Sequence, residues 1–334
     1  MTISRSLTFC LAAAAAAFFA LSCSAQAPES GNGYKIYRTD AKSPAPATPP
    51  RFGVVLVGGN GSPDEAMKFF CDQSGGGEIV VLRATDDNWM NGFFHDACPA
   101  NSVASLVITS AQGANDPHIA AEIAKAHAIF ISGGDQSHYV EMWAGNATQK
   151  EVNDAIARGI PIGGTSAGLA VLGQFVFSSR LDTVTAPQAL ANPYDPKVTL
   201  DRNFLKVPQL DGVITDSHFS QRKRMGRSVA FLARIVQDGW AAQGHGLGID
   251  ETTAVLFDES GIATVVGKGS AYFMTLAHAA EKCEAGQPLV LHGLSVYKLS
   301  PGAGASFDLK NWTGTGGTTF TVETADGKMT RSDQ

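Results

Sequence analysis

The feature that most constrains the fold is a series of short apolar runs that have no polar face. Five of them follow one another in the first half of the chain, at residues 53–57, 79–82, 106–108, 128–131 and 160–164. A strand that is apolar on both faces is typical of a parallel sheet with helices on either side. The segments 63–71, 117–127 and 148–158 between these runs have the character of helices. This alternation predicts an α/β fold with a doubly wound, mostly parallel sheet flanked by helices.

The second half of the chain departs from this rhythm. A long amphipathic helix is predicted over 220–238, because apolar residues recur there at helical spacing. Strand-like runs separated by Gly-rich turns follow it, at 253–257, 262–266, 271–273 and 289–299. We interpret these runs as an antiparallel C-terminal extension of the main sheet. No shift in composition marks a boundary, so we predict a single α/β domain over 52–310.

Two segments are predicted to flank this domain. Residues 26–51 are rich in Pro, Ala and Ser, which predicts a linker or an extended arm. Residues 311–334 are polar and rich in Gly and Thr, which predicts a loosely attached polar tail.

The N-terminus has the pattern of an export signal. Arg5 is the only charged residue among the first 28, an apolar run follows over 7–21, and small residues come next. This order predicts a signal peptide over 1–25, with cleavage after Ala25 or Ala27. The apolar run is shorter than the roughly 20 residues that a membrane-spanning helix needs. We therefore expect a secreted or periplasmic protein without a membrane span.

Cysteine usage fits that compartment. Cleavage of the signal peptide would leave Cys71, Cys98 and Cys283 of the five cysteines. Export favours disulfides, and we expect Cys71 and Cys98 to pair because they lie in the same local region. The alternative of lipid attachment at Cys23 is disfavoured, because residues 20–22 match a lipoprotein site poorly.

Composition excludes several classes of function. The formal net charge is −6, so the chain offers no general electrostatic attraction for nucleic acid. No Cys-x-x-Cys pair and no His/Cys cluster suggests a metal site. Apolar residues make up 44% and charged residues 17%, which fits a folded chain and argues against disorder.

A nucleophile motif stands at residues 164–168, which read Gly-Thr-Ser-Ala-Gly. This G-x-S-x-G pattern follows a buried strand and opens an apolar helix predicted over 167–172. A sharp turn between a strand and a helix needs small flanking residues and projects the central side chain out of the sheet. The context favours Ser166 as a nucleophile over a serine that only caps the helix.

A serine nucleophile needs a base and an acid that orients the base. Among eight histidines, His218 follows the apolar run 212–215 and precedes a helix. It is therefore expected at the carboxyl end of a strand, where α/β sheets place their sites. Glu251 and Asp182 are the two candidates for the acid, and spacing does not choose between them.

Glycine-rich loops follow two of the predicted strands. Gly133 and Gly134 follow the fourth one, and with the backbone N–H of Ala167 they predict an oxyanion hole. Gln136, in the same loop, is a candidate substrate contact. The loop 58–61 reads Gly-Gly-Asn-Gly, which lacks the spacing of a dinucleotide site.

Four segments occur together in one order and carry a resemblance. They are Gly-Gly-Asp-Gln at 133–136, Gly-Thr-Ser-Ala-Gly at 164–168, Asp-Ser-His-Phe-Ser-Gln-Arg at 216–222 and Gly-Leu-Gly-Ile-Asp-Glu-Thr at 246–252. The set resembles the cyanophycinases of the S51 serine peptidase family. These are α/β proteins similar to class I glutamine amidotransferases, with serine in place of cysteine at the elbow. The resemblance covers roughly residues 52–299.

The resemblance implies a substrate and a set of roles. Cyanophycinases cleave cyanophycin, a poly-aspartate with arginine on each side chain, and release β-Asp-Arg dipeptides. It implies that Ser166 is the nucleophile, His218 the base and Glu251 the preferred acid, with no cofactor or metal. It also implies that Gln136 and three basic residues contact the substrate, and those residues are Arg222, Arg224 and Arg227. A homodimer is the tendency of the family.

The chain departs from the family at two places. Ser217 stands where many cyanophycinases have Gln, and a long loop over 178–204 could reshape the pocket. Three alternatives to cyanophycin hydrolysis therefore stay open. They are an S51-type exopeptidase acting on aspartyl or isoaspartyl peptides, an α/β-hydrolase esterase, and a catalytically inactive binding protein of the same fold.

Overall fold

The structure is a computed structural model that describes residues 27–41, 47–85 and 88–333. The predicted signal peptide over 1–25 and its Cys23 lie outside the described residues. Within the described ranges, no helix is both long enough and apolar enough to cross a membrane.

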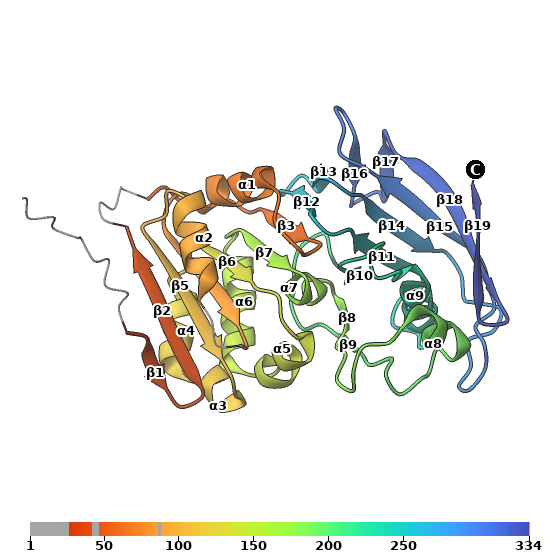
Figure 1. The fold of residues 1–334 in the computed structure, drawn as a ribbon, viewed down its shortest axis with the longest axis horizontal. Helices are drawn as coiled ribbons and strands as arrows, with labels where there is room; N and C mark the ends of the chain where they lie inside the picture. Colours follow the sequence, from red (N-terminus) through yellow and green to blue (C-terminus); the bar gives the residue numbers. More distant parts are fainter. Residues whose placement is uncertain (1–26, 42–46, 86–87, 334) are drawn as a thin grey trace, which may run out of the picture.

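Two sheets lie side by side along the long axis of the molecule (Figure 1). Of the strands described, eleven form the first sheet: β1 (Glu29–Gly31), β2 (Tyr34–Asp40), β3 (Val54–Val57), β4 (Glu78–Arg83), β5 (Ser102–Ile108), β6 (Ala128–Ile131), β7 (Ile162–Thr165), β12 (Thr253–Phe257), β13 (Ile262–Gly267), β16 (Ser306–Asp308) and β17 (Thr313–Thr315). Eight form the second: β8 (Phe175–Phe177), β9 (Leu200–Arg202), β10 (Val213–Asp216), β11 (Gly244–Ile249), β14 (Ala271–Leu276), β15 (Leu291–Leu299), β18 (Thr318–Ala325) and β19 (Lys328–Asp333).

The helices lie between these strands along the chain. They are α1 (Asp64–Ser74), α2 (Trp89–Ala97), α3 (Ala111–Ala114), α4 (Pro117–Ala124), α5 (Gln136–Trp143), α6 (Ala147–Ala157), α7 (Ala167–Ala170), α8 (Ala186–Ala191) and α9 (Met225–Gln237). The helix predicted over 220–238 begins five residues later than expected. Residues 220–224 form a turn instead, in which Lys223 has a φ of 52°.

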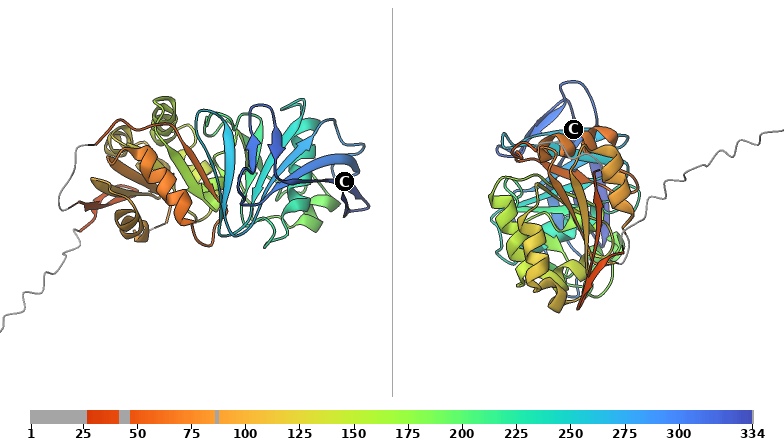
Figure 2. Two further views of the ribbon diagram at one scale, coloured as in Figure 1. Left: turned by 90° about the horizontal axis from the view of Figure 1, so that it is seen from above. Right: turned by 90° about the vertical axis from the view of Figure 1, so that its left-hand side faces the viewer.

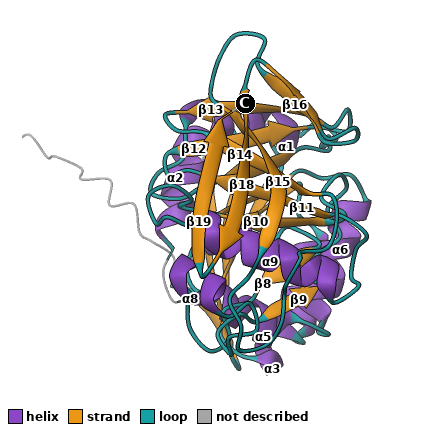
Figure 3. Cartoon of the chain, turned by 90° about the vertical axis from the view of Figure 1, so that its right-hand side faces the viewer, coloured by secondary structure: helices purple, strands orange, loops and turns teal. Residues whose placement is uncertain are grey.

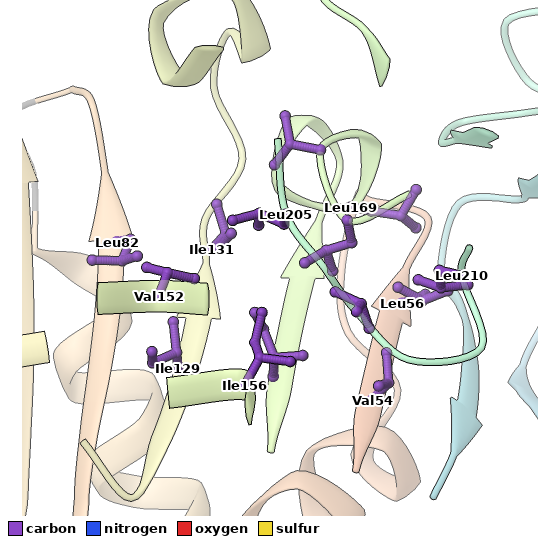
Figure 4. Close-up of a cluster of buried hydrophobic side chains, with 14 of the residues drawn as sticks. Val54, Leu56, Leu82, Ile129, Ile131, Val152, Ile156, Leu169, Leu205 and Leu210 are labelled. Carbon is purple, nitrogen blue, oxygen red and sulfur yellow. The ribbon is translucent and has the colours of Figure 1, made fainter. Parts of the chain in front are cut away.

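The centre of the first sheet is parallel, in the order β5-β4-β6-β7-β3. Alternate residues of these strands point to opposite faces. Val55 and Val57 pack with α1 and α2, whereas Val54 and Leu56 pack with α4 to α7 on the other face. Figure 4 shows the second of these cores, in which side chains of α6 and α7 lie over β3 and β6. The predicted doubly wound α/β fold is confirmed.

The second sheet has the order β19-β18-β15-β14-β11-β10-β8-β9. Strands β8, β10 and β11 run parallel, and the others join antiparallel. Helices α8 and α9 cover one face through a core of their own, and Figure 3 shows them against this sheet. The opposite face contributes Val213, Leu247 and Phe273 to the core of the first sheet. The two sheets therefore share one continuous apolar interior.

The predicted antiparallel extension is divided between the two sheets. Strands β12 and β13 extend the first sheet antiparallel beyond β3, as expected. Strands β14 and β15 belong to the second sheet. The chain passes from one sheet to the other between β11 and β12, over Asp250–Thr252, where Thr252 has a φ of 52°. A left-handed φ at a β-branched residue marks this crossing as a strained turn.

The segment 26–51, predicted as a linker or an extended arm, contains β1 and β2. Strand β2 pairs with β5 along seven residues, and the short β1 pairs with β2 at the edge of the first sheet. Its Ile36 is buried, and its Arg38 forms ion pairs with Glu78 and Glu122. Figure 2 shows this strand at one end of the molecule.

The prediction of a loosely attached tail over 311–334 is wrong. Strand β18 pairs with β15, and β19 pairs with β18. Phe320, Val322 and Thr324 of β18 alternate toward the interior and are at most 2% exposed. The period of two was hidden in a segment dominated by Thr and Gly, so its composition suggested a tail although its pattern is that of a strand.

A disulfide joins Cys71 of α1 to Cys98, the residue after α2, as predicted. The two Cα atoms are 5.2 Å apart and the residues are 27 positions apart in sequence. Cys283 is buried and unpaired. The bridge ties together the two helices that cover one face of the first sheet.

We expect the double variant Cys71→Ser/Cys98→Ser to lose about 3 kcal/mol of free energy of unfolding, because a loop of 27 residues is no longer closed in the unfolded chain. Urea unfolding of the oxidised protein and of the double variant measures the difference. A reductant should lower the unfolding midpoint of the parent protein and leave that of the double variant unchanged. Equal midpoints for parent and double variant would contradict the expected stabilisation.

Candidate active site

Three loops bring Ser166, His218 and Glu251 together where the two sheets adjoin. Ser166 follows β7 of the first sheet, His218 follows β10 of the second by two residues, and Glu251 follows β11. Strands β10 and β11 are parallel neighbours, so their carboxyl ends lie at the same edge. The site is therefore assembled from both sheets.

The backbone at Ser166 is strained. Its φ of 54° and ψ of −115° lie outside the regions that L-residues favour. A Cβ at Gly164 would lie 2.5 Å from the carbonyl oxygen of Gly168, and a Cβ at Gly168 would collide with the carbonyl oxygen of Ile131. The two glycines thus permit a turn in which the strand, the helix and β6 approach closely. This is the geometry of a nucleophile elbow, as the G-x-S-x-G pattern predicts.

Hydrogen bonds link the three side chains in one line. Ser166 Oγ lies 2.7 Å from Nε2 of His218, and Nδ1 of His218 lies 2.7 Å from Oε1 of Glu251. With Nδ1 protonated and donating to the carboxylate, Nε2 is free to accept the hydroxyl proton. This arrangement can activate a serine for attack on a carbonyl group.

The environment keeps the imidazole neutral. Burial lowers the pKa of His218 below its ordinary value, the bond to Glu251 opposes that effect, and the cations Arg222 and Arg224 add to it. The pKa of Glu251 is also lowered, first by its bond to His218 and then by its bond to Asn60. A neutral imidazole next to an ionised carboxylate is the state that a general base requires.

The structure brings Glu251, and not Asp182, to His218. The Asp182 carboxylate is exposed and pairs with Lys197 at 2.8 Å. Its other oxygen accepts the N–H of Thr183 at 2.7 Å. The residue lines a cavity beside the site and makes no hydrogen bond to His218 among the contacts of the described residues.

The loop after β6 passes close to the serine. A Cβ at Gly133 would lie 3.4 Å from Cβ of Ser166 and 3.9 Å from its Oγ, so this loop lies within van der Waals reach of the serine. The hydroxyl of Tyr139 lies 2.9 Å from the carbonyl oxygen of Gly133. Because a trans peptide points its C=O and N–H in opposite directions, this contact turns the N–H of Gly134 away from Tyr139.

A cavity of about 380 Å³ is lined by Gly134, in the loop that passes Ser166, although Ser166 itself is not part of its lining. Its lining carries charges of both signs, from Arg222, Arg224 and Arg227 and from Asp135 and Asp182. Gln136 also lines it and donates to the carbonyl oxygen of Phe177 at 3.3 Å. All four predicted substrate contacts thus line one cavity beside Ser166.

Two of the three arginines are held by a buried carboxylate. Arg227 is 2% exposed and donates from Nε and Nη2 to the two oxygens of Asp216, at 2.8 and 2.6 Å. Arg224 donates to the same carboxylate at 3.1 Å and to the carbonyl oxygen of Ser217 at 2.9 Å. Neither is the solvated residue of a helix face, and much of their donor capacity goes to Asp216.

Arg222 is different. Its side chain is exposed, it lies four residues after His218 and its N–H donates to the carbonyl oxygen of that histidine. Within the described part of the chain, no carboxylate forms an ion pair with it. Of the three predicted basic contacts, Arg222 is the one whose guanidinium is free to bind a ligand.

Sequence reasoning missed two contacts at the site. Nδ2 of Asn60 donates to Oε2 of Glu251 at 2.8 Å, and Oε1 of Gln221 accepts the N–H of Glu251 at 3.0 Å. Asn60 belongs to the Gly-rich loop 58–61, which lacks the spacing of a dinucleotide site and for which the sequence predicts no other role. The glycines on both sides of Asn60 are the sequence signal of a loop that makes close approaches.

Asp250, adjacent to Glu251, supports the turn that carries His218. Its Oδ1 accepts from both N–H and Oγ of Ser220, at 2.9 and 2.5 Å, and its Oδ2 accepts from the N–H of Ser270. It is 5% exposed. No group of three or more His, Cys, Asp or Glu side chains that could hold a metal ion occurs in the described ranges.

The lowered pKa of His218 predicts how the reactivity of Ser166 depends on pH. The neutral imidazole is the active form, so the rate of reaction with a fluorophosphonate probe should reach half its maximum below about pH 6.5, the ordinary pKa of histidine. Arg222→Gln removes a cation that disfavours the imidazolium. It should move the midpoint to higher pH, and the shift should be small because solvent screens an exposed charge.

Lys328→Gln on β19 removes an equally exposed cation far from His218 and serves as the control. A midpoint above that of free histidine in the parent protein, or an equal shift in both variants, would contradict this interpretation.

Comparison with known proteins agrees with this geometry. A sequence model of the family described as Peptidase family S51 matches residues 100–265, about half of the chain. A cyanophycinase of Trichormus variabilis is 28% identical over 208 residues, which cover 61% of this chain and 64% of that protein. One of Synechococcus elongatus is 26% identical over 254 residues, which cover 71% and 73%. The chain thus spans just under two thirds of the length of the first of these relatives.

A solved structure supports the fold. The crystal structure of a peptidase from an acI-B1 Actinobacterium superimposes with a TM-score of 0.53 at 17% identity, over 77% of this chain and 97% of that one. The family match and the relatives show that this chain is similar to the peptidases of family S51, and the solved structure supports the fold.

Proposed function

We propose that this protein is a serine-type peptidase of family S51 that hydrolyses cyanophycin to β-Asp-Arg dipeptides. The observation that carries the proposal is the cavity beside Ser166, which offers both cations and carboxylates. Each unit of cyanophycin presents the guanidinium and the free α-carboxylate of its arginine, so its charges are complementary to this lining. The similarity to the cyanophycinases of Trichormus and Synechococcus supports the same substrate.

The proposed reaction passes through an acyl-enzyme. Ser166 Oγ attacks a backbone carbonyl carbon while its proton moves to Nε2 of His218, and Glu251 stabilises the resulting imidazolium through Nδ1–H. The tetrahedral intermediate collapses, the C–N bond breaks, and the leaving amine takes the proton from His218. Water then attacks the ester, again with His218 as base, and releases the acid product.

Backbone N–H groups would hold the oxyanion in this reaction. Ala167 directly follows the nucleophile, and the N–H of Gly134 is turned away from Tyr139 in a loop that touches Ser166. Gly133 contributes the close approach of that loop. Donors fixed in advance at the developing charge lower the barrier, and removing one typically costs about 10²–10³ in rate.

Arg222 is the proposed carboxylate contact. A guanidinium binds a carboxylate through two parallel hydrogen bonds, and that of Arg222 is exposed and without an ion pair within the described residues. Arg224 and Arg227 contribute positive charge to the cavity wall, while Asp216 and neighbouring oxygens of Ser217, Thr183 and Val184 accept their hydrogen bonds. Asp135 and Asp182 would attract the guanidinium of the substrate from the same cavity.

We further propose that the enzyme acts outside the cytoplasm. The apolar N-terminal pattern and the Cys71–Cys98 disulfide support export, because disulfides persist in oxidising compartments. An exported cyanophycinase would use polymer released by other cells.

Incubation of the mature protein with purified cyanophycin tests the proposed substrate. We expect release of β-Asp-Arg from the parent protein and none from Ser166→Ala, whose fold is checked by its thermal unfolding. Aspartyl and isoaspartyl dipeptides are assayed in parallel. A protein that reacts with a fluorophosphonate yet leaves cyanophycin intact would reject this substrate, and turnover of the dipeptides would identify an exopeptidase.

Arg222→Gln should separate substrate binding from the chemistry of the serine. At pH 8, where His218 is neutral with or without Arg222, the variant should react with the fluorophosphonate at the parent rate. Its kcat/KM for cyanophycin should fall roughly 10- to 100-fold, as loss of a charged hydrogen bond predicts. Arg222→Lys keeps the charge but loses the two parallel hydrogen bonds of a guanidinium. Its kcat/KM for cyanophycin should lie between those of the parent protein and Arg222→Gln. Unchanged cyanophycin kinetics in Arg222→Gln would exclude Arg222 from substrate binding.

A further inference from the structure

The loop 58–61, between β3 and α1, lies directly against the His218–Glu251 pair. The carbonyl oxygen of Gly58 accepts the N–H of His218 at 2.8 Å, and that of Gly59 accepts the N–H of Thr252 at 2.9 Å. A Cβ at Gly59 would lie 2.6 Å from Nε2 of His218, so only glycine leaves room there for the imidazole. The loop thus contacts both segments that carry the pair.

The carboxylate of Glu251 is partly open to solvent. Its side chain is 20% exposed, whereas that of His218 is 7% exposed. A carboxylate at such a position can rotate and exchange its partner for water, since an exposed ion pair is only weakly favoured. Fixing it requires a second anchor besides the histidine.

The structure provides that anchor through Asn60. One carboxylate oxygen, Oε1, faces His218, and the other, Oε2, accepts from Nδ2 of Asn60 at 2.8 Å. An ionised carboxylate only accepts hydrogen bonds, so the amide nitrogen is the end of Asn60 that faces it. With both oxygens bonded to fixed donors, the plane of the carboxylate is set.

We propose that Asn60 is a positioning residue of this peptidase, which acts on the base through the acid by holding Glu251 in the orientation that aligns His218. The proposal rests on the proposed roles of Ser166, His218 and Glu251. It gives the Gly-rich loop 58–61 a role in catalysis. It also explains how a partly exposed glutamate can serve where many triads use a buried acid.

The conformation of Asn60 makes a clean test available. Its φ of 54° favours glycine or asparagine, so Asn60→Gly removes the amide without straining the backbone. Asn60→Asp keeps the size of the side chain but sets a second carboxylate against Glu251. Asn203, with a φ of 62° and its amide oxygen bonded to Gln174, gives the matched control Asn203→Gly.

The charge of the new side chain predicts a different pH dependence for each of the two variants. The groups that face His218 are Glu251, Arg222 and Arg224. Asn60→Gly adds no charge, so it should slow the reaction with little change in its pH midpoint. Asn60→Asp adds a negative charge that stabilises the imidazolium, so the midpoint should move to higher pH.

The experiment measures the rate of fluorophosphonate reaction with Ser166 against pH, together with thermal unfolding. We expect Asn60→Gly to react roughly 10- to 100-fold more slowly at its pH optimum, the loss expected for a hydrogen bond to a charged group. Its unfolding temperature should match that of Asn203→Gly, which should react at the parent rate. With a substrate that is turned over, kcat should fall and KM should stay the same.

Three outcomes would overturn the proposal. The first is a parent-like rate in Asn60→Gly, and the second is an equal loss of rate in Asn203→Gly. The third is an unchanged pH midpoint in Asn60→Asp. Because the probe needs no cyanophycin, failure to digest the polymer would reject the proposed substrate and leave this test intact.

Discussion

The hydrogen bond between Ser166 and His218 joins two sheets, and the rest of the site depends on how those sheets are held together. Strand β7 of the first sheet carries the serine, and β10 of the second carries the histidine. The loop after β3 bridges them, because the carbonyl oxygen of Val57 accepts the N–H of Ser166 and that of Gly58 accepts the N–H of His218. Backbone bonds from one short segment thus fix the positions of both residues.

The second constraint is the buried ion network behind the histidine. Asp216 ends β10 and is 5% exposed, and burial of a carboxylate costs several kcal/mol unless cations and hydrogen bonds compensate it. Arg227 and Arg224 supply that compensation, and they hold the pKa of Asp216 low against the opposing effect of burial. The same bonds leave fewer N–H donors of these two arginines free to bind a ligand. The network therefore fixes the turn that bears His218 and leaves Arg222 as the available cation.

Much of this protein could be predicted from patterns that are local in sequence. Strands buried on both faces, the elbow at Ser166 and the strand-end position of His218 each have a local signature. The choice of the sheet that a strand joins has no local signature. The sequence therefore predicts β14 and β15 in the main sheet, whereas they belong to the second sheet. The apolar alternation of β18 was masked by threonines, and the contact between Asn60 and Glu251 spans 191 residues. Sequence spacing also does not choose between Glu251 and Asp182 as the acid that orients His218. The choice depends on the fold, which brings β10, before His218, beside β11, before Glu251.

The most direct test of the account locates the nucleophile chemically. The folded protein is treated with a fluorophosphonate, digested, and its peptides are mapped by mass spectrometry, with His218→Gln treated in parallel. The account predicts one modified peptide, with the adduct on Ser166, and almost none in His218→Gln. An adduct on another serine, or no adduct in the folded parent protein, would contradict the claim that the line from Ser166 through His218 to Glu251 is the catalytic centre.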